Sequence, residues 1–277
     1  MLENTFSHIP GIGSGTETKL WNAGFLNWDS VLNAESLPVS AKLEKALFKN
    51  IEVSKQHLEH GNPLYFSTVL PSNQTWRMFP VFRDKIAFLD IETTGLGELG
   101  DYITTIVMYD GNSIFSYVQG QNLNDFRHDV QNYDLLVTYN GITFDLPFIR
   151  RYFKIPMKQA HIDLRYVLAS LGYRGGLKSC ERQLGIDRKE LVDVDGFFAV
   201  QLWWDYLNNG NEGALQTLLA YNTVDVVDLE LLLVMAYNMK LKDMPFEESH
   251  TLSLPVLPTV PFDVDMETVN RLRGWRV

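Results

Sequence analysis

The sequence predicts an α/β fold in which a mixed central sheet is flanked by helices. Strand-like runs lie at residues 85–91, 102–109 and 113–118. Asp110-Gly111-Asn112 joins the second run to the third, and aspartate-glycine between strand-like runs is a strong hairpin signal. We therefore expect these three strands to be antiparallel. From residue 122 onward, helical and strand-like segments alternate, with a fourth strand over 134–139, which is the order of an α/β domain.

Length and composition exclude several classes of protein. The chain has 277 residues, enough for one large domain or for a domain with a smaller companion. It is 45% hydrophobic and 21% charged, which is ordinary for a globular protein. No apolar run reaches the length of a membrane span, and Met1 is not followed by a signal-peptide pattern. The single cysteine, Cys180, can form no internal disulfide, so we expect a cytoplasmic protein.

The charge of the chain is unevenly distributed. The net charge of −10 argues against a generic nucleic-acid coat protein. Yet the segment from Ile149 to Lys189 contains ten basic and three acidic residues, so it carries +7 and the remainder carries −17. Such a basic segment predicts a confined groove for phosphates, with Arg174 and Lys178 as its candidate members. The alternative is a solvated helical surface.

Residues 1–62 form a predicted helical N-terminal region. Ile9-Pro10-Gly11-Ile12-Gly13 indicates a tight loop, because glycine accepts positive φ and proline pre-sets a turn. Helices are expected from Ser14 or Thr16 to Gly24, at 29–32 and at 41–57. The loop and the helix after it resemble half of a helix-hairpin-helix element, whose backbone N–H groups can hold a phosphate. The alternative is a small helical cap that packs through Phe6, Trp21, Phe25 and Trp28.

The rest of the chain divides into three predicted segments. Residues 63–83 form a connector rich in aromatic side chains, which we expect to pack on a domain instead of acting as a free linker. Residues 84–241 hold the α/β domain. Residues 242–277 form a proline-containing tail that either packs on a domain surface or meets a protein partner.

The stretch IAFLDIETTGLG, at residues 86–97, is the chemical centre of the sequence. An apolar run delivers two carboxylates, Asp90 and Glu92, with one residue between them. Side chains alternate along a strand, so both carboxylates point to one face. Burial and mutual repulsion disfavour their charged forms, and a divalent metal ion with oxygen ligands would offset both effects. The alternative is a solvated strand end.

A second stretch, LLVTYNGITFDLPFIRRYF at residues 135–153, carries another carboxylate. It predicts a strand that ends near Asn140 and a helix that opens near Asp145. Asp145 either faces the same site as the first two carboxylates or is simply a helix N-cap. Farther along, Asp163 is expected to cap a helix over 164–171.

A third stretch, residues 218–241, is dominated by leucine, valine and alanine and predicts a long, largely buried helix. Tyr221 and Asp225 are four residues apart and therefore lie on one face of this helix. A carboxylate inside so apolar a helix needs a partner. The alternative is an exposed polar stripe of Asn222, Asp225 and Asp228.

Taken together, these stretches resemble the DEDD superfamily of 3′→5′ exonucleases in its DEDDy form. The family motifs are matched by Asp90 and Glu92, by Asn140, Phe144 and Asp145, and by Tyr221 and Asp225. The tyrosine form is similar to the proofreading domains of family-B DNA polymerases, and no histidine lies five residues before any aspartate, as the other branch would require. Most of residues 5–240 also resembles the YprB-like ribonuclease H-like proteins.

The resemblance implies an RNase H-like fold and a 3′→5′ exonuclease that hydrolyses phosphodiester bonds of DNA or RNA at single-stranded 3′ ends. It implies two Mg²⁺ or Mn²⁺ ions, about 3.5–4 Å apart. Asp90 would bridge the ions, Glu92 and Asp225 would complete one of them, and Asp145 would support the other. Tyr221 would orient the attacking water. The implied substrate-binding residues are Thr93, Leu96, Asn140, Phe144, Arg174 and Lys178.

Two other functions stay open at this point. A structure-specific endonuclease could use the N-terminal region to position a junction or flap. A nucleic-acid-binding module could keep the fold without turnover, although a fold alone needs neither the four carboxylates nor the tyrosine.

Overall fold

The computed structural model describes residues 1–188, 191, 194–242 and 244–274 and centres on a five-stranded mixed sheet. Its strands are β1 (Ile86–Thr93), β2 (Ile103–Tyr109), β3 (Ile114–Val118), β4 (Leu135–Thr138) and β5 (Ala160–Asp163). The spatial order is β3-β2-β1-β4-β5. β1, β2 and β3 pair antiparallel, whereas β4 lies parallel to both β1 and β5. The predicted α/β class and the three antiparallel strands are confirmed.

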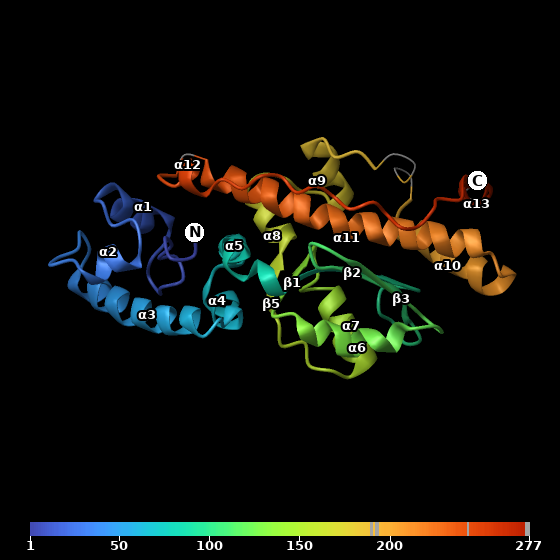
Figure 1. Cartoon of the computed structure of the whole chain (residues 1–277), viewed down its shortest axis with the longest axis horizontal. Helices are drawn as coiled ribbons and strands as arrows, with labels where there is room; N and C mark the ends of the chain where they lie inside the picture. Colours follow the sequence, from blue (N-terminus) through green and yellow to red (C-terminus); the bar gives the residue numbers. More distant parts are fainter. Residues whose placement is uncertain (189–190, 192–193, 243, 275–277) are drawn as a thin grey trace.

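The two faces of the sheet are covered by different helices (Figure 1). On one face the strands pack against α11 (Glu212–Leu241), a helix of 30 residues, and on the other against α6 (Phe126–Asp129) and α7 (Asp145–Phe153). Alternation along β1 creates this division. Ile86 and Phe88 join the core on the α11 side, and Leu89 joins the core on the α7 side. Asp90 and Glu92 have the same parity as Phe88 and therefore face α11.

The remaining helices of the sheet domain follow β5 and precede α11 in the sequence. They are α8 (Leu164–Ala169), α9 (Leu177–Leu184) and α10 (Gly196–Asn209). α10 packs antiparallel on the first half of α11, where Phe198, Leu202 and Trp203 are buried. The fourth predicted strand is present as β4. β5 was not placed from the sequence, because a run of four residues that includes His161 and Asp163 gives no clear strand pattern.

The N-terminal part is helical and packs on the end of α11. Its helices are α1 (Ser14–Asn22), α2 (Trp28–Leu32), α3 (Ala41–Glu59), α4 (Pro63–Val69) and α5 (Phe79–Phe82), with a 3₁₀ segment over Ser72–Met78. Residues 1–13 form turns, so a helix flanks the Pro10-Gly11 loop on one side and not on the other. Phe6, Trp21 and Trp28 are buried, as in the aromatic-cap alternative. The boundaries of the four predicted segments stay predictions.

The C-terminal tail lies along α10 and α11. It contains α12 (Glu247–His250) and α13 (Met266–Arg273), joined by an extended stretch. Arg271 donates two hydrogen bonds to Asp205 of α10, at 3.1 and 2.5 Å, and Leu272 is buried. Trp275 and Arg276 lie outside the described residues. Within the described part of the chain, no helix combines the length and apolar content needed to span a bilayer.

A buried ion pair ties the N-terminal part together. The Arg77 guanidinium lies 3.1 Å from a carboxylate oxygen of Glu17 and 4.7 Å from the ring centroid of Trp76. The other Glu17 oxygen accepts hydrogen bonds from the Thr5 hydroxyl and the Phe6 N–H. One carboxylate therefore holds the first turns, α1 and the 3₁₀ segment against one another, and neither charge could be left alone without a large cost.

We expect Glu17→Ala to lower the free energy of unfolding by about 3–5 kcal/mol, because it leaves the Arg77 charge buried without a partner. Urea denaturation of parent and variant measures this difference. Asp29→Ala is the matched control, since it breaks the exposed pair with Lys55 and should change nothing measurable. Equal effects of the two substitutions would contradict the prediction.

Candidate active site

Three carboxylates from two elements meet above the sheet. Asp90 and Glu92 of β1 and Asp225 of α11 each offer one oxygen, and these oxygens lie within 4.8 Å of one another. Glu92 and Asp225 are buried, and Asp90 is half-buried. Burial first, and then the neighbouring carboxylates, raise the pKa of Asp90 and of Glu92 well above their ordinary values. Asp90 and Glu92 of β1 therefore form one cluster with Asp225 of α11, and the solvated-strand-end alternative is wrong.

The long helix α11 buries its polar face. Asn222, Asp225 and Asp228 are 0%, 5% and 5% exposed, so the exposed-stripe alternative is wrong. Asn222 donates a hydrogen bond to Asp90 at 2.7 Å and accepts one from the Thr105 hydroxyl at 3.0 Å. This buried amide fixes the orientation of Asp90. Sequence reasoning missed its role, because an asparagine in a helix carries no sign of the strand that it will meet.

Asp145 lies beside the three-carboxylate cluster instead of within it. It is the first residue of α7, whose N-cap is Phe144, so the N-cap alternative for Asp145 is wrong. One oxygen accepts the N–H of Ile91, the residue between Asp90 and Glu92, at 3.2 Å. Burial raises the pKa of Asp145 to about 7, although hydrogen bonds from backbone N–H groups oppose this shift. Asp145 is thus anchored on β1.

The loop before α7 is held by a carboxylate from β5. Asp163 accepts hydrogen bonds from the N–H groups of Asn140, Ile142 and Arg165, at 2.8, 3.2 and 3.0 Å. Asp163 therefore caps α8, as expected, but it also fixes the loop that carries Asn140. The φ of Asn140 is +67°, a left-handed conformation that asparagine tolerates better than most residues. A Cβ at Gly141 would collide with the Thr138 side chain, which explains the glycine.

Three other predicted substrate-binding residues are close in sequence to the carboxylates of β1 and α7. The Thr93 hydroxyl donates to the carbonyl of Gly95 at 2.6 Å, at the end of β1. Leu96 follows on the β1–β2 loop and is 90% exposed. Phe144 is half-buried, with its ring centroid 5.9 Å from that of Phe148. An exposed leucine on a loop next to a carboxylate cluster is available to contact a ligand.

Two cations approach the cluster from the α9 side. The Lys178 ammonium lies 4.3 Å from the ring centroid of Tyr221 and is buried without a hydrogen bond in the described structure. Arg188 donates to Asp225 and makes two hydrogen bonds to Glu181, at 2.5 and 2.6 Å. Sequence reasoning missed Arg188 and Glu181 as site residues. The only signal in the sequence was that both lie in the basic segment, and this does not indicate which side chains they contact.

The basic segment does not form one groove. Lys178 and Arg188 point into the carboxylate cluster, whereas Arg174 is exposed and lines a separate pocket next to it. Arg150 and Lys158 line two further pockets. Lys189 lies outside the described residues. Arg174 and Lys178, which were expected to bind phosphates in one groove, therefore lie at two sites, the pocket and the carboxylate cluster.

The donor set fits a divalent cation of the hard class. Such ions take carboxylate oxygens, and Asp90, Glu92 and Asp225 bring three of them together. Burial and mutual repulsion cost free energy when these acids ionise, and a bound cation offsets that cost. The Arg188 guanidinium offsets it only in part, because Arg188 is shared with Glu181.

Asp228, one turn beyond Asp225, provides a test by pH. Burial, followed by the Glu181 carboxylate, raises the pKa of Asp228 to about 7. Because the folded protein binds this proton more tightly than the unfolded chain, whose aspartate pKa is about 4, the parent loses stability as the pH rises from 4 to 7. Relative to the parent, Asp228→Asn should therefore gain stability between pH 4 and 7, on the order of a few kcal/mol, and then level off. Urea denaturation in chelator measures the difference, and a pH-independent difference would contradict the prediction.

Arg188 provides a test by metal. In the metal-free protein, Arg188→Met leaves Asp225 and Glu181 unpaired and should lower the free energy of unfolding by about 3–5 kcal/mol. The same substitution removes a competing charge from Asp225, so Mn²⁺ should bind about tenfold more tightly or better. Calorimetric titration with Mn²⁺ checks the affinity. Arg182→Met, on the exposed face of α9, is the control, and equal Mn²⁺ affinities would refute the competition.

Comparisons with known proteins place the chain in a family. A family model described as the RNase H superfamily matches residues 87–237. No match was found among curated proteins. Among solved structures, the family B DNA polymerase from the hyperthermophilic archaeon Pyrobaculum calidifontis is similar, with a TM-score of 0.43 and 16% identity. That similarity covers 61% of this chain and 27% of the polymerase chain.

The family match spans more than half of the chain and runs from β1 to near the end of α11. It therefore includes every carboxylate of the cluster, together with Asp145 and Tyr221. The chain belongs to the RNase H superfamily.

Proposed function

We propose that this protein is a metal-dependent 3′→5′ exonuclease of the DEDDy type, which hydrolyses phosphodiester bonds at single-stranded ends of DNA or RNA. Membership in the RNase H superfamily supports a nuclease and a nucleic-acid substrate. The observation that carries the finer proposal is the meeting of Asp90, Glu92 and Asp225 in one cluster, with Tyr221 one turn from Asp225. These are the residues that the DEDDy resemblance implies.

The carboxylates would hold the cofactor. Asp90, Glu92 and Asp225 would form one part of the binding set, and Asp145, which accepts the Ile91 N–H, would supply the remaining carboxylate. When bound, two Mg²⁺ or Mn²⁺ ions would stabilise the charge on the attacking and leaving oxygens of the phosphodiester. Asn222 keeps one Asp90 oxygen in place through its 2.7 Å hydrogen bond.

Tyr221 acts as an orienting group and not as a base. Burial first, and then the charge of Asp225, raise the pKa of Tyr221 well above 10. The phenol therefore keeps its proton at neutral pH and can hold an attacking water by hydrogen bonding. Lys178, stacked on the ring of Tyr221, supplies a positive charge beside the carboxylates that could attract a phosphate oxygen. Leu96, exposed on the β1–β2 loop, and Phe144 are positioned to contact the terminal bases.

The decisive experiment uses single-stranded DNA and RNA labelled at the 5′ end, with Mg²⁺ or Mn²⁺. The parent should give a ladder that shortens from the 3′ end. Asp225→Asn should slow this reaction by about 10²-fold or more, because it removes a charge that stabilises the transition state through the bound ions. Glu230→Gln is the matched control, since it removes another buried carboxylate of α11 that lies outside the cluster.

Two controls separate the alternatives. A substrate with a blocked 3′ end should resist cleavage, and internal cuts in it would identify an endonuclease instead. Absence of cleavage of either nucleic acid with either ion, while the thermal unfolding curve is normal, would identify a binding module.

A further inference from the structure

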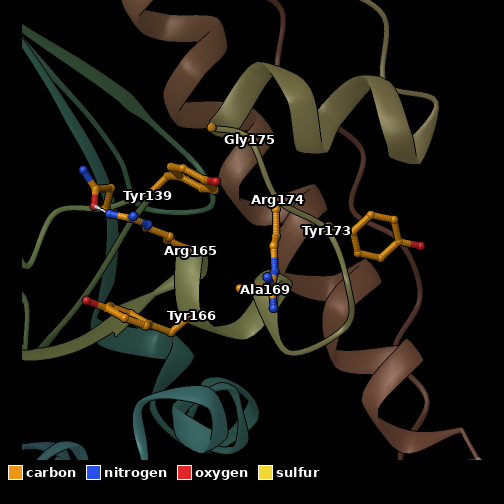
Figure 2. Close-up of a pocket in the computed structure, with 9 residues that line it drawn as sticks. Tyr139, Arg165, Tyr166, Ala169, Tyr173, Arg174 and Gly175 are labelled. Carbon is orange, nitrogen blue, oxygen red and sulfur yellow. Dashed lines mark hydrogen bonds between the residues drawn. The ribbon is translucent and has the colours of Figure 1, made fainter.

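A pocket beside the carboxylate cluster has no part in the chemistry described so far. Its volume is about 650 Å³, within the range of ligand-binding sites. It lies between the end of β4, helix α8 and the segment that leads into α9. Figure 2 shows its lining residues, of which Tyr139, Asn140, Arg165, Tyr166, Tyr173 and Arg174 carry polar or aromatic groups. No acidic side chain is among the residues that line it.

The charged groups of this pocket are available to an anion. Arg165 and Arg174 are exposed, and within the described residues neither forms a salt bridge with a carboxylate. The Arg165 guanidinium donates to the side-chain oxygen of Asn140, which leaves its other N–H groups available. Asp163 lies nearby, but its oxygens already accept three backbone N–H groups. Two guanidinium groups in a pocket without acids favour a phosphate ligand.

The aromatic groups favour a nucleobase. Tyr139 and Tyr166 are half-buried, and Figure 2 shows both rings on the Arg165 side of the pocket, with Arg174 across from them. Tyr173 is turned away, since its hydroxyl donates to the sulfur of Met239 on α11. Aromatic faces that alternate with cationic groups are the usual means of binding single-stranded nucleic acid.

The pocket and the carboxylate cluster share two walls. The first is the β4–α7 loop with the start of α7: Asn140 of the loop lines the pocket, and Asp145, the first residue of α7, contacts β1. The second is the segment before α9 with the first turn of α9: Gly175 lines the pocket, and Lys178 stacks on Tyr221. The Tyr139 hydroxyl and the Cys180 sulfur join these walls at 3.5 Å. The pocket therefore lies next to the carboxylate cluster.

We propose that this pocket binds the nucleotides immediately 5′ of the scissile phosphodiester, with bases stacked on Tyr139 and Tyr166 and a phosphate held by Arg165 and Arg174. This inference rests on the proposed exonuclease function, because it assigns the scissile phosphodiester to the carboxylates. The ligand is a single strand.

Binding tests the pocket independently of cleavage. In the Asp225→Asn background, with chelator, fluorescence anisotropy gives the affinity for a labelled octanucleotide of DNA or RNA. Tyr166→Ala should weaken this binding about tenfold, since stacking contributes roughly 1–3 kcal/mol per base. Tyr166→Phe should restore it, because the ring is retained. Neither Tyr166 nor Arg174 has a side-chain hydrogen bond among the described contacts, so both variants should fold normally.

The salt dependence identifies the phosphate contact. Arg174→Ala should reduce the slope of log affinity against log salt by about 0.7. Arg182→Ala, on the exposed face of α9 and outside the pocket, should leave the slope unchanged. A dinucleotide competitor, too short to fill the pocket, should lose much less affinity than the octanucleotide in every pocket variant.

The outcomes distinguish the two proposals. If Tyr166→Ala and Arg174→Ala bind the octanucleotide like the Arg182→Ala control, the pocket proposal is overturned, even if the parent is an exonuclease. If both variants weaken binding and the parent cleaves no substrate with either ion, the pocket binds a single strand but the exonuclease proposal fails, and with it the assignment of that strand to the 5′ side of a scissile phosphodiester.

Discussion

Repulsion between buried carboxylates is the constraint around which this protein is built. Strand alternation forces Asp90 and Glu92 onto one face of β1, and the packing of α11 on that face adds Asp225. Three clustered carboxylates are tolerated in the folded protein only if hydrogen-bond donors or positive charges offset the cost of burying them. The fold supplies this compensation in two forms, a neutral donor in Asn222 and a cation in Arg188. Each is anchored by a second partner, so the compensation is rigid.

Rigidity at the site depends on contacts far from it. The helix that carries Asp225 has 30 residues and is held at both ends. Near its C-terminus the Trp76 ring packs edge-on against Tyr237, with centroids 5.1 Å apart. Near its N-terminus the tail crosses it, and the Asp265 N–H donates to the Thr217 hydroxyl at 2.9 Å. The N-terminal part and the tail therefore fix the rotation and height of α11, and through them the position of Asp225 relative to β1.

Local pattern predicted what is local, and contacts between distant segments account for the rest. Period and spacing predicted the antiparallel strands and the long helix, the resemblance to a nuclease family pointed to the carboxylates, and the structure confirms the fold class. The roles of Asn222, Glu181 and Arg188 could not be predicted from local pattern. The hydrogen bond from Asn222 to Asp90, for example, joins residues that are 132 positions apart in the sequence. Lys178 was expected with Arg174 in one confined groove for phosphates, yet its buried ammonium lies on the ring of Tyr221. A charge count along the sequence cannot tell a surface cation from one that neutralises a site.

The charges around the cluster also bear on how many ions the site requires. Asp90, Glu92, Asp145, Asp225 and Glu181 face two cations, Lys178 and Arg188, which leaves three negative charges when all are ionised. Asp228 is outside this balance, because it is not among the clustered carboxylates and lines a different pocket together with Arg188. One divalent ion with a phosphodiester would bring a single positive charge and leave the site negative. Under the proposed function, two divalent ions with one phosphodiester would bring three positive charges and balance the site, so the second ion should bind more weakly without substrate.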